Sequence, residues 1–128
     1  MGEKLKLRLR KQQSLTDVKL IELVFKSNHS IKAFPLIFSF NILENSDINL
    51  QVLFSVSKRK FPKAVDRNRI KRLIRESFRL RKPQFEAALR EKNIYGAFIY
   101  TNKELPDFQT IEKSMQKILS KLDEKLRD

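Results

Sequence analysis

The chain has 128 residues, and its 28 Lys and Arg residues outnumber 15 Asp and Glu residues, which gives a formal net charge of +13 at pH 7. This length predicts a single domain over residues 1–128, and the hydrophobic content of 41% argues against simple disorder. The chain has no cysteine, no signal peptide and no apolar run of the roughly 18–20 residues that a membrane span needs. We therefore expect a cytoplasmic protein without disulfides or thiolate metal sites.

The N-terminal part of the chain combines a basic arm with a short helix. Residues 1–13 hold five Lys/Arg and one acid, and three leucines alternate with charged residues, which favours an extended arm. Capping side chains at 14–17 begin a helix that we expect to end near Lys26. His29, the only histidine, falls in the loop that follows. With no cysteine or second histidine to join it, we expect His29 to be exposed and to have no metal or catalytic role.

Two strands are predicted next. Apolar residues alternate with other residues over 34–43 and again over 48–56, which is the period of a β-strand. A polar turn at 44–47 separates them, so we expect an antiparallel hairpin. One face of each strand is strongly apolar, and the other mixes apolar with small polar groups and could stay partly open to a ligand. In the first strand these faces hold Leu36, Phe38, Phe40 and Ile42, and Ile37, Ser39 and Asn41, respectively.

The segment Lys58–Lys82 concentrates the positive charge. It holds twelve Lys/Arg and two acids, a net charge of +10 in 25 residues. The spacing of Ile70, Leu73, Ile74 and Phe78 predicts a helix with one buried stripe. The cations on the remaining surface lie at spacings that bring like charges together, which is unfavourable unless an anionic partner covers them.

The helical period divides the polar side of this helix into two rows. One row consists of Asn68, Lys71 and Arg75, and the other consists of Arg69, Arg72 and Arg79. The wheel assigns Arg67 to neither row, and Glu76 is the acid that interrupts the polar surface.

The C-terminal third completes the fold class. We expect a short helix from Pro83 to about Lys92, a strand over 95–101, and a last helix that begins after Pro106. The order α-β-β-α-α-β-α predicts an α/β (α+β) two-layer sandwich, a small central sheet covered by helices.

No catalytic group emerges from the sequence. There is no pair of nucleophile and base, no Gly-rich phosphate loop, and no His/Asp/Glu cluster at the spacing of metal ligands. We therefore interpret the chain as a binding protein. A metal held mainly by RNA phosphates would leave no mark in the sequence and stays open.

A nucleic acid is the favoured partner, because Lys and Arg side chains gain affinity as phosphates release their counterions. Arginine outnumbers lysine in the basic helix, which favours bidentate phosphate contacts and stacking on bases. A basic amphipathic helix on a membrane surface or an acidic partner is a weaker alternative, because the core needs the apolar side. A DNA-reading helix-turn-helix would need a second helix before residue 58, where the pattern predicts a strand.

The residues 54–80 closely resemble the signature of the bacterial ribonuclease P protein component. That signature is a strand ending in V-S-K-[KR], followed by A-V-x-R-N-R-x-K-R-x-x-R-E-x-F-R. The matching residues are Val56, Ser57, Lys58, Arg59, Ala64, Val65, Arg67, Asn68, Arg69, Ile70, Lys71, Arg72, Arg75, Glu76, Phe78 and Arg79. At Pro62 and Asn28 the family commonly has glycine, and at Ile21 and Ser39 it often has an aromatic residue.

The resemblance implies a function and a topological detail. Family members are non-catalytic partners of a large RNA, which hydrolyses precursor tRNA with Mg²⁺ and releases the 5′ leader. The chain would then bind ribonuclease P RNA and precursor tRNA, with no DNA or membrane partner, and would itself hold no cofactor. The family also has a left-handed strand-helix-strand crossover, an exception to the usual rule.

The resemblance also assigns roles to residues. Contacts with the catalytic RNA are implied for Lys58, Arg67, Arg69, Arg72 and Arg79. The leader cleft would be formed by Arg59, Asn68, Lys71 and Arg75, with Ile21, Phe25, Ile37 and Ser39 as its opposite wall. A general RNA-binding or ribosomal protein, and a nuclease that acts without RNA, are the alternatives.

Overall fold

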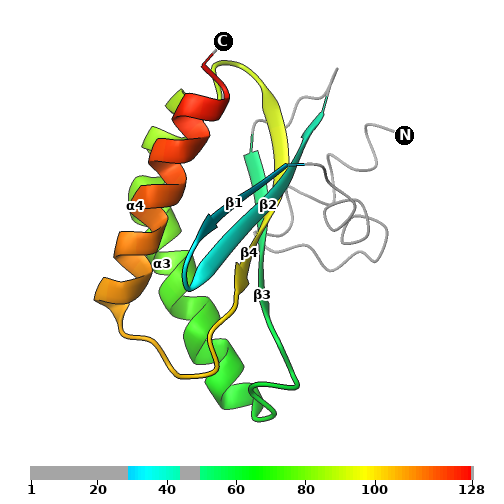
Figure 1. Ribbon diagram of the computed structural model, residues 1–128, viewed down its shortest axis with the longest axis vertical. Helices are drawn as coiled ribbons and strands as arrows, with labels where there is room; N and C mark the ends of the chain where they lie inside the picture. The colour runs from blue at the N-terminus through cyan, green and yellow to red at the C-terminus, as the bar shows by residue number, and fades with distance from the viewer. Residues whose placement is uncertain (1–28, 44–49, 128) are drawn as a thin grey trace.

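The computed structural model describes residues 29–43 and 50–127, which form four strands and two helices (Figure 1). The predicted arm and first helix therefore lie outside the described residues. In chain order the elements are β1 (His29–Ala33), β2 (Leu36–Leu43), β3 (Leu50–Val56), α3 (Ala64–Ala88), β4 (Asn93–Tyr100) and α4 (Phe108–Lys125).

The four strands form one mixed sheet in the order β1-β2-β4-β3. Strand β4 pairs antiparallel with β2 and parallel with β3. The sequence predicts that β2 and β3 pair as a hairpin. This prediction is wrong, because β4 lies between them. Its central place fits its composition, since both faces of β4 carry buried residues, Ile94 and Phe98 on one and Tyr95 and Ala97 on the other.

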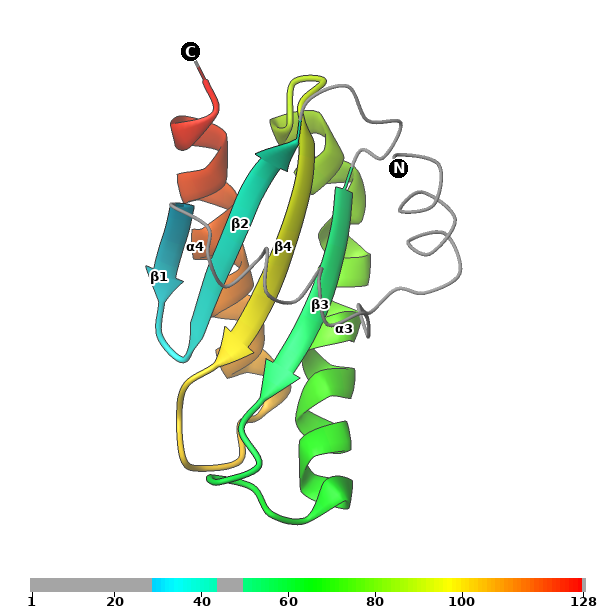
Figure 2. The ribbon, with the colours of Figure 1, turned by 90° about the vertical axis from the view of Figure 1, so that its right-hand side faces the viewer.

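The parallel pair β3 and β4 is joined through α3, and this crossover is left-handed (Figure 2). Both helices cover the same face of the sheet, so the molecule has two layers (Figures 1 and 2). The expected α+β sandwich and its unusual crossover are thus confirmed.

The core lies between the sheet and the helices, around the ring of Phe98. Its ring centroid lies 4.5 Å from that of Phe38 in β2 and 6.0 Å from that of Phe54 in β3. From α3, the rings of Phe78 and Phe85 approach to 5.6 and 6.1 Å. Burying each such ring contributes about 1.5–3 kcal/mol, so this cluster fixes which side of α3 faces inward.

Gly96 is required by the packing of this core. A Cβ atom at Gly96 would lie 2.4 Å from two carbon atoms of the Phe38 ring, which occupies the space above the glycine. The Phe38 ring on β2 therefore requires glycine at position 96 of β4.

Two details of the predicted elements are corrected. A strand, β1, replaces the predicted loop at His29 and pairs antiparallel with β2. The basic helix and the short helix after it are one continuous helix, α3, with Pro83 inside it. Pro83 is exposed, whereas Phe78 and Phe85 on either side of it are buried and contact each other at 5.3 Å. Core packing on both sides of the proline thus holds the helix together against the loss of one hydrogen bond.

Candidate nucleic-acid interface

The loop between β3 and α3 presents the first cations of the basic segment. The Oγ atom of Ser57 accepts hydrogen bonds from the backbone N–H groups of Arg59 and Lys60, at 3.1 and 3.3 Å. Buried Phe61 anchors the loop, and the Lys60 Nζ atom donates to the backbone carbonyl of Thr101 at 2.8 Å. The side chains of Lys58 and Arg59 are exposed. The loop is therefore held by its backbone while these two cations remain available.

Arg67 stabilises the start of α3 from inside the helix. Its Nη1 atom donates to the backbone carbonyls of Phe61 and Pro62, both at 2.8 Å. The N-cap residue Lys63 makes no side-chain capping bond, so Arg67 takes part in holding this turn. Half-buried Arg67 thus has a structural contact that the helical wheel could not predict.

The outward row of α3, formed by Arg69, Arg72 and Arg79, carries two arginines that are unpaired within the described residues and one that is paired. Arg69 and Arg72 are exposed and make no hydrogen bond or ion pair within the described part of the chain. Arg79 instead forms an ion pair with Glu76, at 2.6 Å between Nη2 and Oε2, and both side chains stay largely exposed. This hydrogen bond from Arg79 lowers the pKa of Glu76 and raises that of Arg79. Glu76 therefore lowers the net charge at the Arg79 end of the row, whereas the end with Arg69 and Arg72 remains fully cationic.

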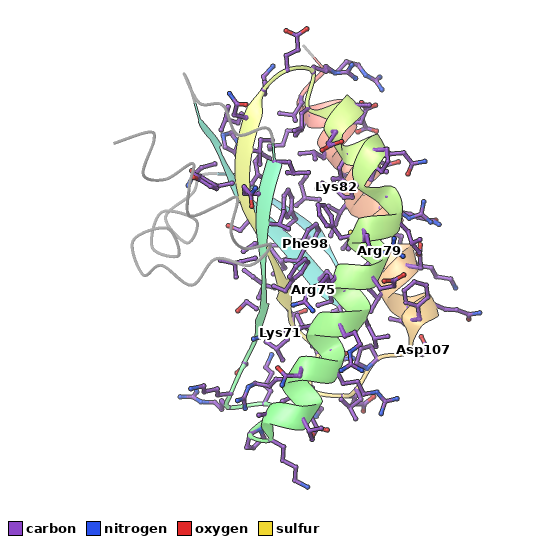
Figure 3. The ribbon with its side chains drawn as sticks, turned by 180° about the vertical axis from the view of Figure 1, so that it is seen from behind. Lys71, Arg75, Arg79, Lys82, Phe98 and Asp107 are labelled. Atoms are coloured by element: carbon purple, nitrogen blue, oxygen red, sulfur yellow. The ribbon has the colours of Figure 1, made fainter. Side chains whose placement is uncertain are left out.

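The second row runs along the side of α3 that faces β3. Figure 3 shows Lys71 and Arg75 between the helix and the edge strand, with Lys82 further along the same helix. The guanidinium carbon of Arg75 lies 5.4 Å from the centroid of the Phe54 ring, a cation–π contact. Asn68 is exposed, and Lys71 is half-buried. The two rows predicted from the helical period therefore exist as separate surfaces of α3.

The face of the sheet turned away from the helices carries Ile37 and Ser39, each half-buried. Phe38 and Phe40 point into the core instead and are fully buried. The register places Ser39 beside Ala97, which in turn pairs with Leu53. Since strands are about 4.8 Å apart, β2 lies roughly 10 Å from β3, the edge that α3 borders. Ile21 and Phe25, the other wall in the prediction, lie outside the described residues.

Tyr95 is a further residue of this outer face that the prediction of the site did not include. It pairs with Asn41 on one side and Gln51 on the other. Its ring is fully buried, and its hydroxyl has no hydrogen-bond partner among residues 29–43 and 50–127. Burial raises the pKa of this hydroxyl to about 12. Strand periodicity alone could have placed it there, since Tyr95, Ala97 and Ile99 alternate with the core residues.

Arg81 belongs to the helix contact rather than to the cationic surface. Its Nε and Nη2 atoms donate to the Oε1 atom of Glu112 in α4, at 3.0 and 2.6 Å. Arg81 is one of the cations of the segment Lys58–Lys82, which the sequence predicts to bind a nucleic acid. The structure instead commits it to the contact between α3 and α4.

The described residues contain neither a cluster of metal ligands nor a membrane-spanning helix. No group of three or more His, Cys, Asp or Glu side chains in residues 29–43 and 50–127 could hold a metal ion. Neither α3 nor α4 is long and apolar enough to cross a membrane.

A small basic α+β protein is thus defined, in which one long cationic helix packs by its apolar side on a four-stranded sheet with a left-handed crossover. The family model Ribonuclease P matches residues 9–123. The chain belongs to this family.

Relatives of known name support the assignment. The chain is 39% identical over 105 residues to the ribonuclease P protein component of Porphyromonas gingivalis, a match that covers 80% of this chain and 77% of the relative. It is 31% identical over 124 residues to that of Chlorobium phaeobacteroides, covering 87% and 85%.

Solved structures show the same fold. The RNase P protein from Thermotoga maritima superposes with a TM-score of 0.68 at 23% identity, covering 86% of this chain and 97% of that one. The protein from Staphylococcus aureus gives 0.65 at 24% identity, covering 85% and 94%.

Proposed function

We propose that this chain is the protein subunit of ribonuclease P, which binds the catalytic RNA and the 5′ leader of precursor tRNA. In this role it supports the endonucleolytic removal of the leader in the cytoplasm. One observation carries the proposal: α3 buries its apolar stripe in the core and leaves Arg69 and Arg72 exposed and unpaired within the described residues. Such a surface gains most from a polyanion.

The two rows of α3 suit two different partners. We assign the catalytic RNA to the outward row and its flanks, where arginine forks match phosphate oxygens. We assign the leader to the row beside β3 and to the outer face of the sheet. A single-stranded RNA can run from this row onto that face. The first set is Lys58, Arg67, Arg69, Arg72 and Arg79, and the second is Ile21, Phe25, Ile37, Ser39, Arg59, Asn68, Lys71 and Arg75.

In this proposal the RNA performs the hydrolysis, and Mg²⁺ bound to that RNA supplies the metal chemistry. The protein contributes positive charge and shape. Its cations offset the repulsion between the phosphates of the leader and those of the catalytic RNA. Precursor tRNA therefore gains affinity over mature tRNA, which lacks the leader.

Reconstitution with the cognate RNA tests the proposal. Processing of precursor tRNA is measured across a series of Mg²⁺ concentrations, with and without the protein. We expect the protein to shift half-maximal processing to lower Mg²⁺, because its cations replace part of the counterions. Failure to stimulate processing at any Mg²⁺ concentration would reject the role.

Binding of precursor and mature tRNA to the assembled complex separates this role from general RNA binding. A subunit that holds the leader increases the affinity for precursor tRNA alone. Equal increases for both tRNAs would indicate a general RNA-binding protein. Cleavage by the protein after its RNA has been digested would indicate a nuclease that acts without RNA.

A further inference from the structure

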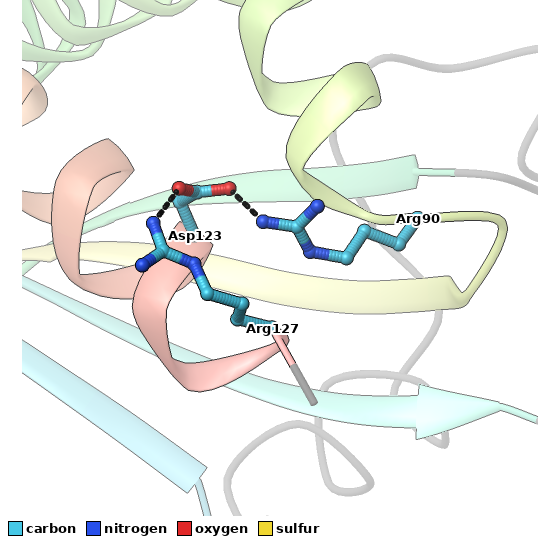
Figure 4. A network of polar contacts seen from close by, with 3 residues as sticks. All are labelled: Arg90, Asp123 and Arg127. Carbon is cyan, nitrogen blue, oxygen red and sulfur yellow. Dashed lines mark hydrogen bonds and ion pairs between the residues drawn. The ribbon is translucent and has the colours of Figure 1, made fainter.

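The acids of α4 that face α3 are already engaged by arginines. Glu112 receives both hydrogen bonds of Arg81, and this pair is mostly buried, with side chains 23% and 18% exposed. Near the other end of the helix, Asp123 bridges two arginines (Figure 4). Its Oδ1 atom lies 2.7 Å from the Arg90 Nη2 atom, and its Oδ2 atom lies 2.9 Å from the Arg127 Nη2 atom. These carboxylates therefore neutralise charge on the α3 side of the helix.

Four lysines occupy another side of α4. Lys113, Lys117, Lys121 and Lys125 recur at every fourth residue, and all four are exposed. A step of four residues turns about 40° around the helix, so the row of lysines turns gradually towards the side of α4 that borders β1. The Lys121 Nζ atom donates to the backbone carbonyl of Lys32 at 3.1 Å.

A groove of about 550 Å³ lies where this side of α4 meets β1. It is lined by Ser30, Ile31, Lys32, Lys121, Glu124 and Lys125. We call Lys32 and the four lysines of α4 the α4 lysine surface, and three of these five, Lys32, Lys121 and Lys125, line the groove. Glu124 is the acid within it, and its side chain forms no ion pair with any residue in the described ranges.

This distribution of charge is unfavourable for a helix exposed to water alone. Lysines four residues apart repel each other, whereas alternating signs would stabilise the helix by a few tenths of a kcal/mol per pair. Here two acids of α4, Glu112 and Asp123, are held on the α3 side by arginines. Glu124 remains among the lysines, and Asp107 lies near Lys113, so the lysines outnumber the acids beside them. The α4 lysine surface therefore matches an extended anionic partner.

We propose that the α4 lysine surface is a second binding site for the phosphate backbone of the large RNA that α3 contacts. This inference rests on the proposed function. Lysine is a point charge that contacts phosphates without the fork geometry that reads bases, which fits a backbone contact. Both helices lie in the same layer, so a large folded RNA can reach α3 and α4 together (Figure 1).

Two other anionic partners fit the geometry less well. The leader is proposed to lie on the outer face of the sheet, whereas α4 covers the opposite face (Figure 2). A membrane surface would need apolar side chains beside the lysines, but Ile111, Met115, Ile118 and Leu122 are all fully buried in the core.

Salt dependence of RNA binding tests the site. The affinity of full-length protein for the catalytic RNA alone is measured over a range of salt concentrations for wild type and for Lys121→Gln/Lys125→Gln. Each lost phosphate contact lowers the slope of log K against log salt by about 0.9, so we expect a fall of about two in the double variant.

The matched control is Gln84→Glu/Gln116→Glu, which changes net charge by the same two units. These glutamines line the groove between α3 and α4, whose lining contains none of the lysines. We expect the control to keep most of the wild-type slope. An equal fall in both double variants would show an effect of net charge alone and overturn the proposal, as would an unchanged slope in the lysine variant.

Further binding measurements identify which anionic partner the α4 lysine surface contacts. A loss confined to precursor tRNA binding by the assembled complex would overturn the choice of the catalytic RNA. A loss confined to vesicles of phosphatidylglycerol and phosphatidylcholine would make the surface a membrane contact. Arg69→Ala/Arg72→Ala keeps the two hypotheses separable: if it leaves RNA binding unchanged, the proposed function itself fails. If it weakens binding while the lysine variant does not, only the second site fails.

Discussion

The guanidinium group of Arg75 lies over the ring of Phe54, 5.4 Å from its centroid, at the line where α3 borders the edge of the sheet. Phe54 belongs to the core, and its ring contacts those of Phe78 and Phe98. The cation is therefore held in position by the core while remaining exposed to a ligand. Lys71, one turn earlier in the same row, has no such contact among the described residues.

Replacement of Arg75 by alanine should reduce stability as well as binding. Loss of the cation–π contact is expected to lower the free energy of unfolding by about 0.5–1 kcal/mol, the range for exposed pairs. Urea denaturation measures the change, with Arg69→Ala as the control, since exposed Arg69 makes no cation–π contact with a described residue. Equal effects of the two substitutions would mean that the Phe54 contact adds no stability.

Substitution of the two rows of α3 should separate assembly from precursor binding. Arg72→Ala is expected to weaken binding of the protein to the catalytic RNA, because it removes an exposed cation of the outward row that has no partner in the described ranges. Lys71→Ala is expected to leave assembly intact and to weaken precursor tRNA binding by the complex. One phosphate contact corresponds to roughly one unit of salt slope in each assay. Identical patterns of defect for the two variants would disprove the assignment of the rows.

Gly96→Ala should destabilise the fold, because the added methyl group would overlap the ring of Phe38. Overpacking of this kind costs about 1–3 kcal/mol. Adding Phe38→Leu to Gly96→Ala should recover part of that loss, since the smaller side chain leaves room. A double-mutant cycle followed by urea denaturation measures the coupling. Additive effects of the two substitutions would show that the contact does not constrain residue 96.

Asp107 should make the stability of α4 depend on pH. As the N-cap, its Oδ1 atom accepts a hydrogen bond from the backbone N–H of Thr110 at 2.8 Å. Hydrogen bonding with the Thr110 side chain, together with this backbone bond, lowers the pKa of the carboxyl group. A lowered pKa in the folded state contributes stability that is present above the usual aspartate pKa. That contribution is lost as the pH falls through the lowered value.

The matched variant for this prediction is Asp107→Asn, which keeps a capping side chain but cannot titrate. We expect the difference in melting temperature between wild type and variant to shrink or reverse in acid. The comparison runs from pH 6 down to about pH 2 in thermal unfolding. A difference that stays constant over this range would contradict the role of the carboxylate charge.

The basic helix was predictable because its information is local. Burial of Ile70, Ile74 and Phe78 follows directly from their spacing, and so do the two rows of the polar side. The pattern underestimates its length because Pro83 is typical of a helix start, whereas the core holds Phe85 in place beyond it. Contacts such as that of Arg67 with the preceding loop depend on backbone geometry that spacing does not encode.

Strand pairing was not predictable from the same kind of information. Strands β2 and β3 each have apolar residues on both faces, so their alternation is compatible with several neighbours. What decides the order is β4, which buries residues on both of its faces and is accommodated best between them. Strand β1 was missed because it spans five residues and pairs at the sheet edge, where one face of the strand stays largely exposed.

The central position of β4 has a consequence for biosynthesis. On the ribosome, β2, β3 and α3 all emerge before β4, the strand that joins β2 and β3 into one sheet. Until Asn93–Tyr100 leaves the exit tunnel, β3 lacks the neighbour with which it forms its backbone ladder. The nascent chain therefore carries its most cationic segment, on a polyribosome crowded with RNA, before the supporting sheet can close.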